Sequence, residues 1–241
     1  MKNIILFSLL ALVFASGCRE INGRRAKGNG IAGSETRNVS SFTNIDVSGA
    51  VNVYIKQDSA TTVKVEADEN LLQYIKTRVD GNTLVIESED GIWMRPKRTI
   101  NVYVSNPTYN NFEVSGASKL NGESLISSTG DFHFNFSGAS GGRLEIDAPK
   151  VAVELSGASS LTLNGKTKDL EVDVAGASKA NCYNLLAESV KAVSSGASGA
   201  DVYSSVKINA HASGASHVYY KGNAVEEEKS ESGASKVRKV N

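Results

Sequence analysis

The feature that most constrains this 241-residue chain is a short motif, Ser-Gly-Ala-Ser or a close variant, which recurs through its second half. Successive motif glycines are 22, 19, 19, 20, 18 and 19 residues apart from Gly116 onward. A fixed period of this length indicates a repeat fold in which each unit packs on its neighbour. The glycines are Gly116, Gly138, Gly157, Gly176, Gly196, Gly214 and Gly233, with an earlier copy at Gly49.

The residues before each glycine alternate in polarity. Positions −6, −4 and −2 are mostly apolar, as in Phe132, Phe134 and Phe136, and the residues between them are mainly polar. Such alternation is typical of a strand with one buried face. About 19 extended residues at ~3.3 Å each make a coil of two or three short strands. We therefore predict an all-β fold, a β-solenoid whose coils stack in parallel.

An antiparallel meander is the structural alternative, because Asn164-Gly165 resembles a hairpin turn. The constant phase of the motif favours parallel stacking, since a meander gives no reason to align every glycine. We expect the alternation of inward and outward side chains to be interrupted at Gly-Ala, where the chain turns a corner. At that corner the alanine is expected to face inward, and the serines to bond to loosened backbone groups.

The region before the repeat reads as further strands and one short helix. Alternating apolar residues predict strands near 43–47, 51–55, 63–65 and 100–104, and the apolar run Leu84-Val85-Ile86 reads as a further strand. The segment 68–75 predicts a short helix with Asp68 as its N-cap. We assign residues 39–110 to an N-terminal β region and 111–241 to the repeat solenoid, as one continuous body. The last coil places Glu227, Lys229 and Glu231 at inward positions, which predicts a polar cap.

The N-terminus has the pattern of an export signal. A basic residue precedes a short apolar run, so residues 1–17 read as a signal peptide. Ala15-Ser16-Gly17-Cys18 resembles a bacterial lipobox, which makes Cys18 the expected lipid attachment site; ordinary signal cleavage is the alternative. Residues 18–38 are Gly-rich and charged, and we predict a flexible tether there. The expected location is the bacterial cell envelope, at the outer membrane.

The composition points away from several function classes. Lys plus Arg and Asp plus Glu both number 26, so no nucleic-acid partner is expected, and membrane contact is expected through the lipid alone. The histidines His133, His211 and His217 fall in three different coils, so we expect no metal, no cofactor and no catalytic residue. Cys182 occupies an inward position and reads as a small buried side chain.

One pair of outward-facing acids could form a catalytic or cation-binding site. Position −3 places Glu154 and Asp173 on adjacent coils, where parallel stacking brings them to about 4.8 Å. Two carboxylates at that separation could form a glycosidase pair or bind a cation. Aromatic residues that would support a sugar are missing beside them, and solvated surface acids are the competing interpretation.

Several segments together resemble the bacterial auto-transporter adhesin, head GIN domain family. The resemblance rests on Gly28-Asn29-Gly30, on FTNIDVSGAVNVYI (42–55), on VEADENLLQYI (65–75) and on the later SGAS units. It covers the chain from about Arg37 to the end. It implies a β-helix-like fold, export to the envelope and frequent lipidation, and it supplies no catalytic residues.

These observations predict a non-enzymatic, lipid-anchored envelope protein. Its expected role is that of an adhesin or display scaffold that contacts a glycan, a protein or another envelope component. A polysaccharide lyase or hydrolase is the first alternative, because β-helices often host such enzymes. A structural or sensory lipoprotein that faces the periplasm is the second.

Overall fold

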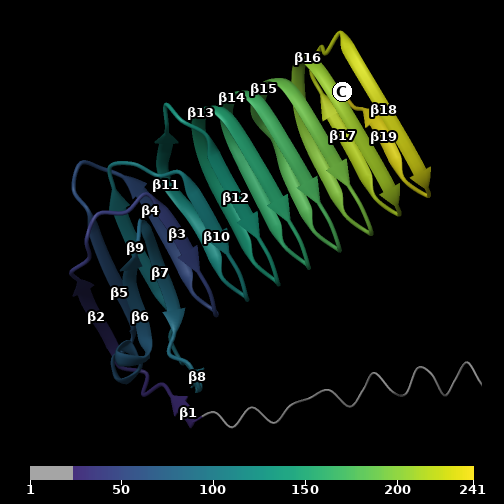
Figure 1. Ribbon diagram of the computed structural model, residues 1–241. Helices are drawn as coiled ribbons and strands as arrows, with labels where there is room; N and C mark the ends of the chain where they lie inside the picture. Colours follow the sequence, from purple (N-terminus) through teal and green to yellow (C-terminus); the bar gives the residue numbers. More distant parts are fainter. Residues whose placement is uncertain (1–23) are drawn as a thin grey trace, which may run out of the picture.

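The computed structural model describes residues 24–241, in which coils stack side by side from the N-terminal to the C-terminal end (Figure 1). The predicted signal peptide, Cys18 and the first residues of the predicted tether lie outside this range. The N-terminal strands are β1 (Arg24–Lys27), β2 (Ala32–Arg37), β3 (Asn44–Val47), β4 (Asn52–Gln57), β5 (Thr62–Asp68), β6 (Ile75–Asp80), β7 (Thr83–Ser88), β8 (Ile92–Arg95) and β9 (Asn101–Asn106).

The repeat region supplies the remaining strands of a 17-stranded sheet; β1 and β8 form a separate two-stranded sheet. The solenoid has about seven turns of roughly 19 residues, which confirms the predicted fold class. The strands of the repeat are β10 (Asn111–Val114), β11 (Lys119–Ser127), β12 (Phe132–Phe136), β13 (Gly141–Leu155), β14 (Ser160–Val174), β15 (Lys179–Ser194), β16 (Gly199–Gly214), β17 (His217–Lys221), β18 (Glu226–Gly233) and β19 (Lys236–Lys239).

Parallel pairing advances by one coil at each step. Val151 pairs with Leu170, which pairs with Val190, which pairs with Ile208. The antiparallel meander is therefore wrong for the repeat. The hairpin-like Asn164-Gly165 lies inside β14, which stays in parallel register with β13 there, while its pairing with β15 shifts by one residue between Thr162 and Asn164.

The motif glycines form a ladder of stacked corners. Each adopts a positive φ, 76° at Gly176 for example, which favours glycine because it has no Cβ. The N–H of Ala177 donates to the carbonyl oxygen of Gly157 on the preceding coil at 2.8 Å, and the corners from Gly116 to Gly214 accept the same bond. This stacking confirms that the small residues recur because successive corners nest.

The side-chain directions at the corner differ from our expectation. The alanine that follows each motif glycine is exposed, as Ala177 shows, whereas the serine at +2 is buried, as Ser178 shows. The prediction that the alanine faces inward and that the alternation of inward and outward side chains is interrupted at the corner was wrong. The inward side chains keep even positions, counted from the motif glycine, on both sides of the corner. The serine fits there because its hydroxyl binds carbonyl oxygens of the bend: Ser216 Oγ donates to Ser213 O and to Ser194 O on the preceding coil.

The inward side chains before each corner become smaller toward the C-terminus. Phe112 stacks on Phe134 with ring centroids 4.8 Å apart, whereas later coils place alanines and serines inward, such as Ala192 and Ser194. The last coil keeps the corner, but its strand before the corner has no apolar face, since every residue of β18 is exposed. There Lys229 pairs with Glu227 at 2.6 Å and lies over the Tyr220 ring.

The N-terminal end of the sheet is mixed. The sheet gains antiparallel pairs there, β2 with β5, β5 with β9, and β6 with β7. The predicted tether is wrong for residues 24–37, because β1 and β2 are strands whose backbone groups pair with β8 and β5. Among residues 24–241 no helix is long and apolar enough to cross a membrane.

The expected short helix is present as a 3-10 helix, η2 (Glu69–Tyr74), which buries Leu71 and Leu72. Asp68 stands at its N-cap position but does not cap it with its side chain, so that prediction was wrong. Its buried carboxylate instead accepts hydrogen bonds from the backbone N–H groups of Gly30, Lys97 and Arg98, at 2.7, 2.8 and 3.1 Å. Asp68 thus ties together three segments of the N-terminal end.

Candidate ligand-binding surface

Glu154 and Asp173 are neighbours, as the spacing predicted. They are in-register partners on β13 and β14, and they line a shallow hollow of about 200 Å³ with Glu171 and Lys191. Lys150 pairs with Glu171 at 3.4 Å nearby. The hollow has mixed charge and no aromatic side chain, so the acids form part of a polar outer face.

The structure forms no acidic or histidine cluster suited to a metal within residues 24–241. His133 is exposed on β12 and His211 is half-buried on β16. His217 differs from both, because its Nε2 lies 3.8 Å from Asp201 Oδ1 on the preceding coil. The sequence reading of His217 as isolated missed this neighbour, since Asp201 falls at +5 of its coil and His217 at +3.

Asp201 is the centre of a group of side chains on the outer face of the strand segments that follow the motif. We call Lys179, Tyr183, Asp201, His217 and Tyr219 the Asp201 cluster. Asp201 is only 5% exposed, which is unusual for an acid on an outer sheet face. Lys179 Nζ lies 3.0 Å from its Oδ2, so one carboxylate oxygen is paired.

The other oxygen of Asp201 has no hydrogen-bond partner in the described part of the chain, although it is buried. A buried polar atom without a partner costs free energy, so a donor that reaches this oxygen once a covering side chain moves aside would be stabilised. Two rings lie beside Asp201 on the next coil, those of His217 and Tyr219. His217 and Tyr219 lie with ring centroids 4.4 Å apart, and the imidazole occupies the space that a Cβ on Gly199 would fill.

The last member of the Asp201 cluster is Tyr183, which lies on β15. Burial, followed by the charge of Asp201 and a hydrogen bond with Asp201, raises the pKa of the Tyr183 hydroxyl, so the hydroxyl stays protonated. Lys221 Nζ lies 5.2 Å from the centroid of the Tyr183 ring. The cluster therefore offers a carboxylate acceptor, two tyrosines, an imidazole and cations at one place.

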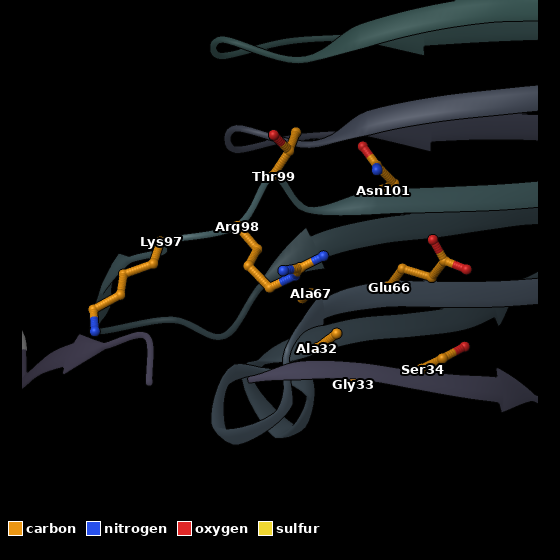
Figure 2. A pocket seen from close by; sticks show the side chains of 9 residues that line it. All are labelled: Ala32, Gly33, Ser34, Glu66, Ala67, Lys97, Arg98, Thr99 and Asn101. Carbon is orange, nitrogen blue, oxygen red and sulfur yellow. The ribbon is translucent and has the colours of Figure 1, made fainter. Parts of the chain in front are cut away.

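A larger hollow of about 520 Å³ lies at the N-terminal end, between β2, β5 and the segment before β9. Figure 2 shows Arg98 reaching across Ala67 in this hollow, while Lys97 points away from the other labelled side chains. Glu66 and Ser34 line the same hollow. It is open and polar, and it contains neither an aromatic platform nor a second carboxylate beside Glu66.

The two cysteines of the sequence have different predicted roles. Cys18, the predicted lipid site, lies outside the described residues. Cys182 is fully buried on the inward side of β15, as predicted, and burial raises the pKa of its thiol to about 12. An inert buried thiol is the consequence.

Comparison with known proteins finds one matching family and several solved structures of the same fold. A family model described as "Putative auto-transporter adhesin, head GIN domain" matches residues 41–224. Comparison with curated proteins gives no match.

Several solved structures share the fold, and three of them illustrate the range of similarity. One, described as a putative adhesin from Bacteroides fragilis, is 20% identical with a TM-score of 0.85, and the alignment covers 89% of this chain and all of that one. A putative adhesin from Parabacteroides merdae is 16% identical with a TM-score of 0.71, covering 91% and 100%. A protein from Parabacteroides distasonis, described as a putative lipid binding protein, is 21% identical with a TM-score of 0.68, covering 90% and 100%.

Proposed function

Because this chain belongs to the auto-transporter adhesin, head GIN domain family, we propose that it is a non-enzymatic adhesin of the bacterial envelope. In this proposal a lipid on Cys18 anchors it, and the β-solenoid is a rigid support for a binding surface. The ligand binds at the Asp201 cluster, and its class is a glycan.

The observation that carries this proposal is the buried, unpartnered Oδ1 of Asp201 beside the rings of His217 and Tyr219. Binding sites combine apolar and aromatic surface with a few polar groups that fix orientation. Sugar hydroxyls donate hydrogen bonds to carboxylates, and the apolar faces of sugar rings pack on tyrosines. Lys179 and the Tyr183 hydroxyl add donors at the rim of the same surface.

Binding of the purified mature chain to a glycan array tests the proposal. Asp201→Asn removes the negative charge at nearly constant shape, and we expect affinity for the bound glycan to fall about 10- to 100-fold. Asp173→Asn is the matched control, because it makes the same change on the outer face of another strand segment and should leave affinity unchanged. Equal affinities of the wild type and Asp201→Asn, or the absence of any glycan binding, would refute the assignment.

The lipid anchor has a separate test. Cys18→Ala should move the protein from the membrane pellet to the soluble fraction, and retention in the pellet would contradict anchoring through Cys18. Protease treatment of whole cells should cut the wild-type protein if it faces outward. Protection would favour the alternative of a structural or sensory lipoprotein that faces the periplasm.

The alternative of a polysaccharide-active enzyme depends on Glu154 and Asp173. Their hollow holds Glu171 and Lys191 as well, which is the mixture expected of a solvated face. Turnover of a polysaccharide panel that is abolished by Glu154→Ala or Asp173→Ala would overturn the non-enzymatic assignment.

A further inference from the structure

The two-stranded ribbon of β1 and β8 has two different faces. The parallel pairing sets Arg25 beside Trp93 and Lys27 beside Arg95, so these four side chains share one face. The opposite face contacts the body of the protein through Ala26, which is buried, and Met94, which packs against the core. The face with Arg25, Lys27, Trp93 and Arg95, which we call the ribbon face, therefore points outward.

The inner side of the ribbon is fixed to the body. Arg24 Nη2 donates to Tyr74 Oη at 2.8 Å, and its guanidinium lies 5.8 Å from the centroid of that ring. Just beyond the two strands, the N–H groups of Gly30 and Lys97 donate to the Asp68 carboxylate at 2.7 and 2.8 Å. These contacts hold the ribbon face in one orientation.

The ribbon face is cationic, with an exposed aromatic ring at its centre. Trp93, the only tryptophan in the chain, is 52% exposed. Within residues 24–241, Arg25, Lys27 and Arg95 make no ion pair with an acid. The ranges 24–31 and 92–98 contain six basic residues and no acidic one, although acids and bases are equal in number over the whole chain.

The position of the ribbon in the chain indicates what this face contacts. Only five residues separate Cys18 from Arg24, and six steps of extended chain span at most about 20 Å. With a lipid on Cys18, the ribbon therefore stays within about 20 Å of the membrane surface. Figure 1 shows β1 and β8 at the N-terminal end of the stack, far from β18 and β19.

Tryptophan is enriched at membrane–water interfaces, where its ring lies among headgroups, and arginine and lysine are attracted to anionic lipids. We propose that the ribbon face docks on the anionic lipid headgroups of the membrane that holds the Cys18 lipid. The protein then rests on the bilayer through two contacts, the lipid and the ribbon face. This extends the expectation from composition, in which the lipid was the sole membrane contact.

The placement of the ribbon near the bilayer depends on the proposed lipid anchor, whereas recognition of headgroups by the ribbon face does not. The test therefore uses the mature chain, residues 18–241, with Cys18→Ala and no lipid. We expect it to sediment with vesicles of phosphatidylcholine containing about one third phosphatidylglycerol, and much less with pure phosphatidylcholine. Emission of Trp93 should shift to shorter wavelength on binding, and binding should weaken steeply in high salt.

Two charge-reversal variants locate the contact. Arg25→Glu, Lys27→Glu and Arg95→Glu together should reduce vesicle binding at least tenfold. Lys236→Glu, Arg238→Glu and Lys239→Glu make the same charge change on β19 at the far end and should leave binding unchanged. Circular dichroism checks that both variants keep their sheets. If the ribbon variant unfolds, Trp93→Ala tests the same face without a charge change, and it should weaken binding several-fold.

Three outcomes would overturn the proposal. They are equal binding to anionic and neutral vesicles, equal loss in both charge-reversal variants, or Trp93 emission that stays constant while the protein is bound. Each of these outcomes can be distinguished from failure of the adhesin proposal. The glycan array tests binding at the Asp201 cluster, and cell fractionation tests the lipid anchor on Cys18. If the protein binds glycans but does not bind anionic vesicles, only the proposal for the ribbon face is contradicted.

Discussion

The Cβ that Gly176 lacks would lie 2.6 Å from the carbonyl oxygen of Gly157, directly below it on the preceding coil. That oxygen already accepts the N–H of Ala177 at 2.8 Å. The backbone of one corner thus occupies the space that a side chain on the next corner would need. Stacked corners with hydrogen-bonded backbones exclude every residue larger than glycine at this position.

Gly176→Ala should be strongly destabilising for two physical reasons. Its φ of 76° lies in the left-handed region, and the added methyl would overlap the Gly157 backbone. We expect the free energy of unfolding to fall by about 2–4 kcal/mol, measured by denaturant titration.

Gly81→Ala separates the two contributions, because Gly81 has a φ of 58° but no atom within 4 Å of an added Cβ. It should cost about 1 kcal/mol, the strain of the left-handed backbone alone. Gly130→Ala, with ordinary φ and a nearest neighbour at 3.7 Å, should cost still less. Equal losses at Gly176 and Gly81 would contradict the role of corner stacking.

Much of the fold was predictable from the sequence because the motif marks the one position in every coil where only glycine fits. The parallel register followed from the constant spacing of the motif, and the strands near 43–47 and 100–104 followed from the alternation of apolar and polar residues. The direction of Ala177 did not follow, because an alanine is compatible with either face. Residues 24–37 were misread, because strands rich in Gly and charge at a sheet margin lack the apolar alternation of a buried strand.

The serine at +2 of the motif should contribute through hydrogen bonds rather than through size. Ser216 Oγ donates to Ser194 O and Ser213 O, each at 2.8 Å, and accepts the Ser213 N–H at 3.1 Å. Ser216→Ala should lower the free energy of unfolding by about 1–2 kcal/mol in denaturant titration. Ser213→Ala is the control and should be nearly neutral, because Ala175 occupies the same motif position in another corner. The reverse order of these two losses would show that the +2 hydroxyl is dispensable.

The Asp201 cluster was not predictable in the same way. The sequence carried one usable signal, since Asp201 and His217 occupy outward positions on adjacent coils. Nothing in the sequence states that Asp201 is 5% exposed, because that burial depends on how the outward side chains of neighbouring coils pack. The lateral packing of outward side chains is a property of the stacked fold and not of the repeat period.

Cys182 should be unreactive in the folded protein. Burial raises the pKa of its thiol to about 12, so at pH 8 almost none is thiolate, and the reactive form of cysteine is the thiolate. In the mature chain with Cys18→Ala, where Cys182 is the one remaining cysteine, Ellman's reagent should react only after denaturant is added. Rapid reaction of the native protein at pH 8 would contradict the burial of Cys182 in the core.

Asp68 should make the N-terminal end sensitive to acid. Burial alone would raise the pKa of its carboxyl, but the N–H groups of Arg98, Lys97 and Gly30 together hold that pKa below its ordinary value of 3.8. A folded-state pKa below the unfolded one stabilises the protein above about pH 4, and that stabilisation is lost as the pH falls through the folded pKa. Asp68→Asn should therefore lower the thermal midpoint clearly at pH 7, and this difference from the wild type should shrink at pH 2–3. Asp80→Asn, on an exposed site of β6, is the control and should leave the midpoint unchanged at both pH values. A difference between wild type and Asp68→Asn that stays constant from pH 7 to pH 2 would mean that the charge of Asp68 does not hold these three segments together.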